Sequence, residues 1–117
     1  MTKASWETLP EAKDGMEELI ALSQVALTDP QKAVVRIARI RELCEAGRAK
    51  RPEGMPGYIY NEYRQGLGHE RTAMDRFTQY FDTLDVHYRD QGITEVEKGT
   101  AHFLKAGKMM TDLADKV

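Results

Sequence analysis

The C-terminal stretch, residues 94–117, reads TEVEKGTAHFLKAGKMMTDLADKV and carries the most regular apolar pattern of the chain. Its apolar and small residues follow alternating steps of three and four positions: Val96, Gly99, Phe103, Ala106, Met110, Leu113 and Val117. This spacing places them on one face of an α-helix that packs lengthwise against another helix. Thr94 and Glu97 have the spacing of a capping box, so we expect this helix to begin near Thr94, just after Gly92.

Helical periodicity continues over most of the preceding chain, and strand-like alternation is hard to find. Residues 57–91 keep one helical phase, which fits either one long helix or two helices separated at Gly66 and Gly68. We expect the break, because glycine is a poor helix former and helices of such length are uncommon. The segment before them, residues 48–57, holds two prolines and two glycines and is predicted to be a loop.

Two further helices are expected before this loop. A capping box at Thr8 opens the first of them, and Asp29 followed by Pro30 predicts the start of the second. The short connection between these two helices predicts an antiparallel hairpin. The chain is therefore expected to be all-α, a compact bundle of four to five helices that forms a single helical domain over residues 1–117.

Composition restricts the classes of partner. The 117 residues carry a formal net charge of −2, so binding to nucleic acid or to an anionic membrane would need a local basic patch. The single cysteine, Cys44, cannot form an internal disulfide, and no apolar run is long enough to span a bilayer. We therefore expect a cytoplasmic protein without a membrane partner.

No residue pattern predicts catalysis, a metal site or a cofactor. The three histidines, His69, His87 and His102, lack the Glu-x-x-His spacing of a metal site in a bundle core. The chain has no nucleophile elbow, and Gly66 and Gly68 do not continue into Rossmann or Walker spacing. We expect a protein that is not an enzyme, with no catalytic residue, metal ligand or cofactor.

Surplus apolar and aromatic residues point instead to protein–protein contact. Several large apolar residues fall outside the helical stripes, and the last helix has a nearly heptad pattern. We therefore expect a regulatory protein of the inhibitor or anti-activator type, which forms a homodimer and docks helices onto a protein partner. The residues expected to contact the partner are Tyr58, Tyr60, Tyr63, Phe103, Met110 and Leu113.

A nucleic-acid-binding accessory protein is the alternative, because residues 30–51 hold seven cations against two acids. These cations would bind phosphate, while the neighbouring tyrosines stack on bases. The same cations would pair with acidic groups if they only frame the core, and we favour this second interpretation. The candidate nucleic-acid-binding residues are Lys32, Arg36, Arg39, Arg48, Lys50 and Arg51.

Overall fold

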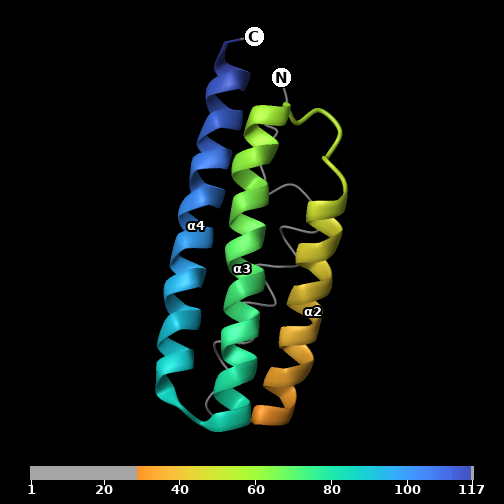
Figure 1. The fold of residues 1–117 in the computed structure, drawn as a ribbon. Helices are drawn as coiled ribbons and strands as arrows, with labels where there is room; N and C mark the ends of the chain where they lie inside the picture. The colour runs from red at the N-terminus through yellow and green to blue at the C-terminus, as the bar shows by residue number, and fades with distance from the viewer. Residues whose placement is uncertain (1–28, 117) are drawn as a thin grey trace.

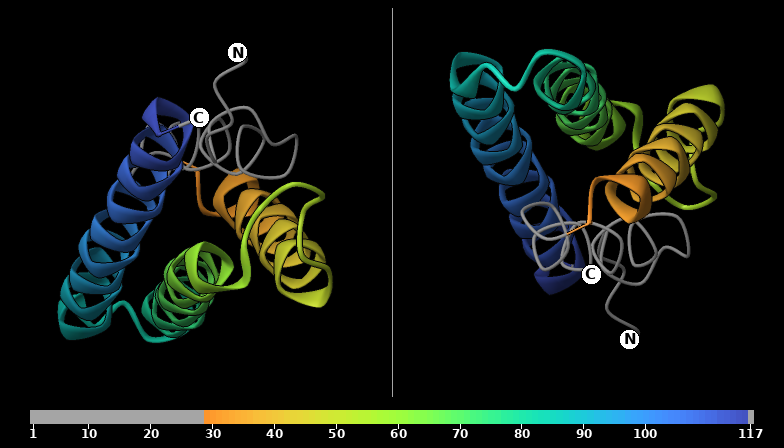
Figure 2. Two further views of the ribbon diagram at one scale, coloured as in Figure 1. Left: turned by 90° about the horizontal axis from the view of Figure 1, so that it is seen from above. Right: turned by 90° about the horizontal axis from the view of Figure 1, so that it is seen from below.

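The computed structural model describes residues 29–116, which contain three α-helices: α2 (Pro30–Ala49), α3 (Gly57–Thr83) and α4 (Val86–Asp115). The helices run up, down and up, with α3 between the other two (Figure 1). α3 packs along both neighbours and most extensively along α4. The end-on views show the three helices as a triangle with α3 at one corner (Figure 2). The all-α prediction is confirmed, whereas the three helices of this part of the chain do not match the predicted four to five.

α2 begins where the Asp29–Pro30 pair predicts it. The Asp29 carboxylate accepts a hydrogen bond of 3.2 Å from the backbone N–H of Lys32, and a proline stands in the first turn. The face of α2 that packs in the core is formed by Ala33, Ile37, Ile40, Leu43 and Cys44. The first predicted helix, and its hairpin with α2, lie outside the described residues.

The predicted break at Gly66 and Gly68 is wrong, because α3 continues through both glycines. Gly66 is buried against α4. Packing of this kind supplies most of the stability of a helix in a folded protein, and it outweighs the low helix propensity of glycine. The loop predicted over residues 48–57 is shorter, because α2 ends at Ala49 and α3 begins at Gly57.

The predicted helix start at Thr94 is also wrong, because α4 already begins at Val86. The carboxylate of Asp85 caps this end by accepting a hydrogen bond of 2.9 Å from the backbone N–H of His87. The Thr94 hydroxyl lies inside the helix and donates to the carbonyl oxygen of Asp90. The predicted stripe faces the interior as far as Leu113, and the buried residues of α4 are Gly92, Gly99, Phe103, Ala106 and Met110. Val117, the last member of the predicted stripe, lies outside the described residues.

The core joins all three helices and the loop between α2 and α3. Its largest fully buried side chains are Tyr63, Ile40, Ile59 and Met74. Each apolar side chain of this size contributes about 1.5–3 kcal/mol when it is removed from water. The core thereby fixes the register of α3 against both neighbours, and this register decides which polar side chains meet at the helix contacts.

Candidate functional site

Two glycines bring α3 and α4 into unusually close contact. A Cβ atom on Gly66 would lie 3.1 Å from the carbonyl oxygen of Gly99, and a Cβ atom on Gly99 would lie 3.0 Å from that of Gly66. Both distances are shorter than ordinary van der Waals contact. The two backbones can approach this closely because neither position carries a side chain.

The same motif, Glu-x3-Gly-x2-His, surrounds each of these glycines. On α3 it is formed by Glu62, Gly66 and His69, and 33 residues later on α4 it is formed by Glu95, Gly99 and His102. Because the helices are antiparallel, the histidine of each helix meets the glutamate of the other. We call these six residues the α3–α4 seam.

The histidines of the seam are each held by a carboxylate. His69 Nδ1 lies 2.6 Å from a carboxylate oxygen of Glu95, and His102 Nδ1 lies 2.6 Å from one of Glu62. Since an ionised carboxylate can only accept, each Nδ1 atom carries a proton and donates it. The two imidazole rings stack with 5.2 Å between their centroids and 10° between their planes.

Two lysines of α4 extend the seam at its ends. Lys98 Nζ lies 3.5 Å from Glu95, and Lys105 Nζ lies 3.7 Å from Glu62. The hydrogen bond from His69 and the charge of Lys98 lower the pKa of Glu95. The seam therefore pairs each carboxylate with one imidazole and one ammonium group, and these pairs form in the register that the core sets for α4 against α3.

The stacked histidines are poorly arranged to chelate one metal ion. An ion bound by two imidazoles lies near the plane of each ring, about 2.0–2.1 Å from each nitrogen. The nearly parallel planes of His69 and His102 stack on one another, so no single point satisfies both rings. In agreement, the described residues contain no group of three or more His, Cys, Asp or Glu side chains that could hold a metal ion.

Glu70 is a buried acid beside the seam. Its side chain is only 2% exposed, and within residues 29–116 neither of its carboxylate oxygens has a hydrogen-bond partner. A Cβ atom on Gly99 would lie 2.8 Å from one of these oxygens, so the glycine makes room for the carboxyl group. Burial raises the pKa of Glu70 to about 8. At neutral pH this side chain is therefore mostly protonated.

The neighbouring thiol of Cys44 is also perturbed. Burial, followed by the negative charges of Glu70 and Glu45, raises its pKa to about 12. The thiol is free and buried, so it packs as a small apolar group and is a weak nucleophile.

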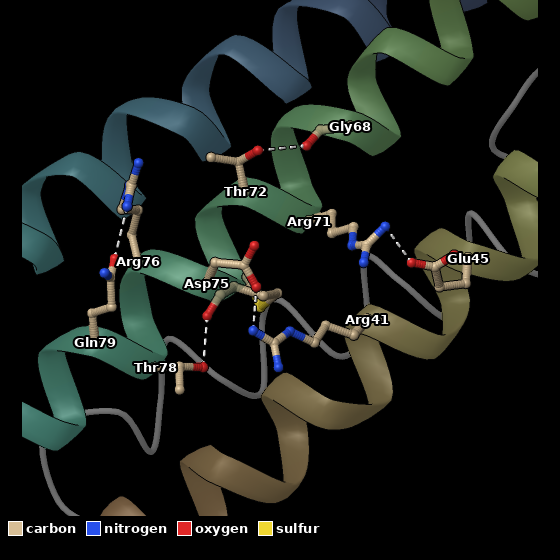
Figure 3. Close-up of polar contacts among 10 residues, drawn as sticks. Arg41, Glu45, Gly68, Arg71, Thr72, Asp75, Arg76, Thr78 and Gln79 are labelled. Carbon is tan, nitrogen blue, oxygen red and sulfur yellow. Dashed lines mark hydrogen bonds and ion pairs between the residues drawn. The ribbon is translucent and has the colours of Figure 1, made fainter.

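A second polar cluster joins α2 to α3 through crossed ion pairs. Arg41 of α2 pairs with Asp75 of α3, and Arg71 of α3 pairs with Glu45 of α2 at 2.5 Å (Figure 3). Together with Glu42 these four side chains line a shallow surface depression. Because all four are about half exposed, solvent screens the pairs and each adds little stability.

The structure places most of the predicted partner-contact residues in the interior. Tyr63, Phe103 and Met110 belong to the core, and Leu113 packs against it while partly buried. The Tyr60 hydroxyl lies 2.9 Å from the carbonyl oxygens of both Gly47 and Arg48, so it caps the end of α2. Of the six predicted residues, only Tyr58 is largely exposed, at 57%.

The predicted nucleic-acid-binding residues fall into two groups. On α2, Lys32 pairs with Asp29 and Arg39 pairs with Glu42, while Arg36 is half-buried. Around the loop, Lys50 and Arg51 are exposed and Arg48 is half-buried. Acidic neighbours therefore offset part of the charge of α2, as expected for cations that frame a core.

The comparisons with known proteins add no relative: no protein-family model matches the chain, and neither a curated protein nor a solved structure matches it. Between residues 29 and 116, none of the helices combines the length and the apolarity that crossing a bilayer requires.

Sequence reasoning missed the four charged or titratable residues of the seam: Glu62, His69, Glu95 and His102. Each histidine lies far in sequence from the glutamate that it meets, so a search for local spacing does not connect them. The signal that identifies them is the repetition of Glu-x3-Gly-x2-His on two helices that pack antiparallel.

Proposed function

We propose that this chain is a small, non-enzymatic regulatory protein that docks a helical surface onto a protein partner. The observation that supports the proposal is a row of exposed apolar residues along α4. Val86 is 51% exposed, Ile93 is 45% exposed and Leu104 is 62% exposed. We call these three residues the α4 outer row.

The outer row runs straight along the helix. Its members are separated by seven and eleven residues, and at about 100° per residue both intervals return to nearly the same direction. The buried residues of α4, such as Gly99 and Ala106, point to the opposite side. A helix that presents apolar groups on both sides has one face left for a partner.

The charges beside the outer row indicate the chemistry of the partner. Asp90 and Glu97 flank Ile93 and are exposed. Lys108, four residues after Leu104, is also exposed, so the acidic part of this surface lies around Ile93. An amphipathic helix with apolar residues at matching intervals and lysine or arginine facing Ile93 would complement it. We therefore propose a basic amphipathic helix of another protein as the docking partner, a homodimer as the working unit, and the cytoplasm as its location, in keeping with the free thiol of Cys44.

Substituting the outer row tests this proposal. The double variant Ile93→Asp/Leu104→Asp places two charges in the docking face, and we expect it to weaken partner binding by at least about 100-fold. Val34→Asp/Val35→Asp is the matched control, because these residues of α2 are also exposed, at 54% and 68%. Proteins captured from extracts of the source cells by the parent chain would be identified, purified and titrated against each variant.

The proposal predicts one protein that binds the parent chain and the α2 control with similar affinity and loses affinity for the outer-row variant. Equal binding by all three chains, or no saturable binding by any of them, would contradict it. Circular dichroism spectra of the variants would show whether the helices are retained.

The nucleic-acid alternative is favoured by one observation, which is the position of Lys50 and Arg51. Both cations are exposed in the loop before α3. The guanidinium group of Arg51 lies 3.4 Å from the position that a Cβ atom on Gly57 would occupy, and the next residue, Tyr58, is 57% exposed. Exposed cations beside an accessible aromatic ring suit the backbone and bases of single-stranded nucleic acid.

This alternative predicts a steep dependence on salt. Each phosphate contact adds about 0.7 to the slope of the logarithm of affinity against the logarithm of salt concentration. The variant Lys50→Ala/Arg51→Ala should therefore reduce the slope for a single-stranded oligonucleotide by about 1.4, measured by fluorescence anisotropy. An unchanged slope would reject a role for these two cations.

A further inference from the structure

The turn between α3 and α4 contains only Leu84 and Asp85. Leu84 adopts the left-handed conformation, with φ of 59° and ψ of 19°, and it is the only non-glycine residue with positive φ between residues 29 and 116. A branched side chain is disfavoured there, and helices that end in this way usually use glycine. The Leu84 side chain is also 70% exposed.

The sequence around this turn continues the pattern of a single helix. Apolar and small residues recur every three or four positions across it, at Phe77, Phe81, Leu84, Tyr88, Gly92 and Val96. All of them except Leu84 are buried or partly buried. Neither glycine nor proline occurs in residues 83–86. A continuous helix through the turn would place Leu84 on the same face as its neighbours in this series and remove its left-handed conformation.

We infer that two copies of this chain exchange α4, so that α3 and α4 of each copy join into one helix and pair with those of a second copy. The inference rests on the homodimer of the proposed function and specifies how that dimer forms. Exchange preserves the seam, because His69 of one protomer then meets Glu95 of the partner subunit. The joined helix, from Gly57 to Asp115, would be about 90 Å long.

Two features of the turn and of the helices that it joins support the exchange. The contact between α3 and α4 is the most extensive in the described fold, so a swapped dimer keeps its largest interface. Opening the hinge relieves the left-handed conformation of one leucine in each protomer. A short, strained connection between two long elements is the usual setting for domain swapping.

The ion pair between Lys105 and Glu62 provides a direct test on the unmodified chain. Their charged groups lie 3.7 Å apart and belong to α4 and α3, so a zero-length carbodiimide reagent can join them. Unlabelled and ¹⁵N-labelled chains would be mixed, unfolded and refolded together at high concentration before cross-linking. Exchange predicts cross-linked peptides that contain one labelled and one unlabelled partner. Peptides of a single isotope composition only would overturn the inference.

Variants of Leu84 separate hinge strain from side-chain docking. Leu84→Gly removes the strain of the turn and weakens the joined helix, so the dissociation constant of the dimer should rise by about tenfold for each of its two hinges, or about a hundredfold. Leu84→Ala also loses the apolar side chain, but it keeps most of the strain and favours the joined helix, so its dissociation constant should rise at least about tenfold less than that of Leu84→Gly. Mass would be followed by light scattering across a range of concentrations.

Three results would overturn the exchange: a monomeric parent chain at every concentration, a Leu84→Gly dimer as stable as the parent dimer, or equal losses in both Leu84 variants. The outer-row variant Ile93→Asp/Leu104→Asp distinguishes the two proposals. If it loses partner binding but still gives mixed-isotope peptides, both hold. If it binds the partner unchanged while mixed-isotope peptides form, exchange stands and the docking surface is wrong. If the outer-row variant loses binding and no mixed-isotope peptides form, docking stands without exchange.

Discussion

Replacing Glu70 by glutamine is expected to remove a pH-dependent loss of stability of about 4 kcal/mol between about pH 5 and about pH 8.5. The carboxyl group is buried without a hydrogen-bond partner among the described residues, and burial raises its pKa to about 8 in the folded chain. The ordinary pKa of a glutamate, 4.5, applies to the unfolded chain. Between these two values the folded state binds one more proton than the unfolded state.

The sign of the effect follows from this proton. Stability contributed by the protonated Glu70 is fully present below the unfolded pKa of 4.5 and is lost as the pH rises through about 8. Glutamine resembles the protonated acid in shape and does not titrate, so the variant should keep its stability across this range. Urea unfolding at several pH values measures the free energy of unfolding of the parent chain and of the variant as a function of pH.

An exposed glutamate supplies the control for Glu70. Glu97 lies on α4 and is exposed, so Glu97→Gln removes one carboxylate without changing a buried group. The free energy of unfolding of each variant is compared with that of the parent chain at each pH. This difference cancels the contribution of Glu95, whose pKa is lowered and which therefore titrates at more acidic pH. If the free energy of unfolding changes with pH in the same way for the parent chain and for Glu70→Gln, Glu70 is solvated or paired and the prediction is wrong.

Gly66→Ala should destabilise the fold by about 2 kcal/mol, because overpacking in a tight core costs about 1–3 kcal/mol. An added methyl group would lie 2.5 Å from the Phe103 ring and 3.1 Å from the carbonyl oxygen of Gly99. The ring itself packs against Tyr63, at 5.6 Å between centroids. α3 and α4 would therefore have to separate, and the hydrogen bonds of the seam would lengthen.

Gly68→Ala, two residues further along α3, is expected to stabilise the fold. No atom lies within 4 Å of the position that its Cβ would occupy, so the substitution should stabilise α3 by about 0.8–1 kcal/mol through helix propensity alone. Chemical unfolding of the two variants should differ by about 3 kcal/mol. Similar stabilities would mean that α3 and α4 are farther apart at Gly66 than the structure shows.

Helix boundaries could be predicted from the sequence where local chemistry determines them. The predictions were wrong where tertiary packing determines the boundary. Asp29 and Pro30 mark the start of α2, because an N-cap carboxylate and a first-turn proline act within a few residues. Glycines at positions 66, 68 and 92 were expected to interrupt helices, but Gly66 and Gly92 are instead contact points for aromatic rings of the facing helix. Leu84 and Asp85 form the actual turn without the usual glycine signal.

The candidate site was harder to predict because its parts come from different helices. The apolar stripe of residues 94–117 correctly indicated which face of α4 is buried, since helical period alone determines that face. It could not show that His102 meets Glu62, because this contact depends on the register of α4 against α3. The arginines of α2 were correctly expected to have acidic neighbours, but Asp75 of α3 could not be identified as one of them without the fold.

The two-residue connection between α3 and α4 also has a kinetic consequence. When residues beside the turn pair first, each further contact closes a loop only slightly longer than the last, so little chain entropy is lost at each step. In folding of this kind, contacts between α3 and α4 form one after another, from the turn towards Gly57 and Asp115. The rate at which α3 and α4 pair within one chain does not depend on protein concentration, whereas the rate at which two chains associate does. The rate at which ribosomes supply new chains would therefore decide how often α4 closes onto its own α3.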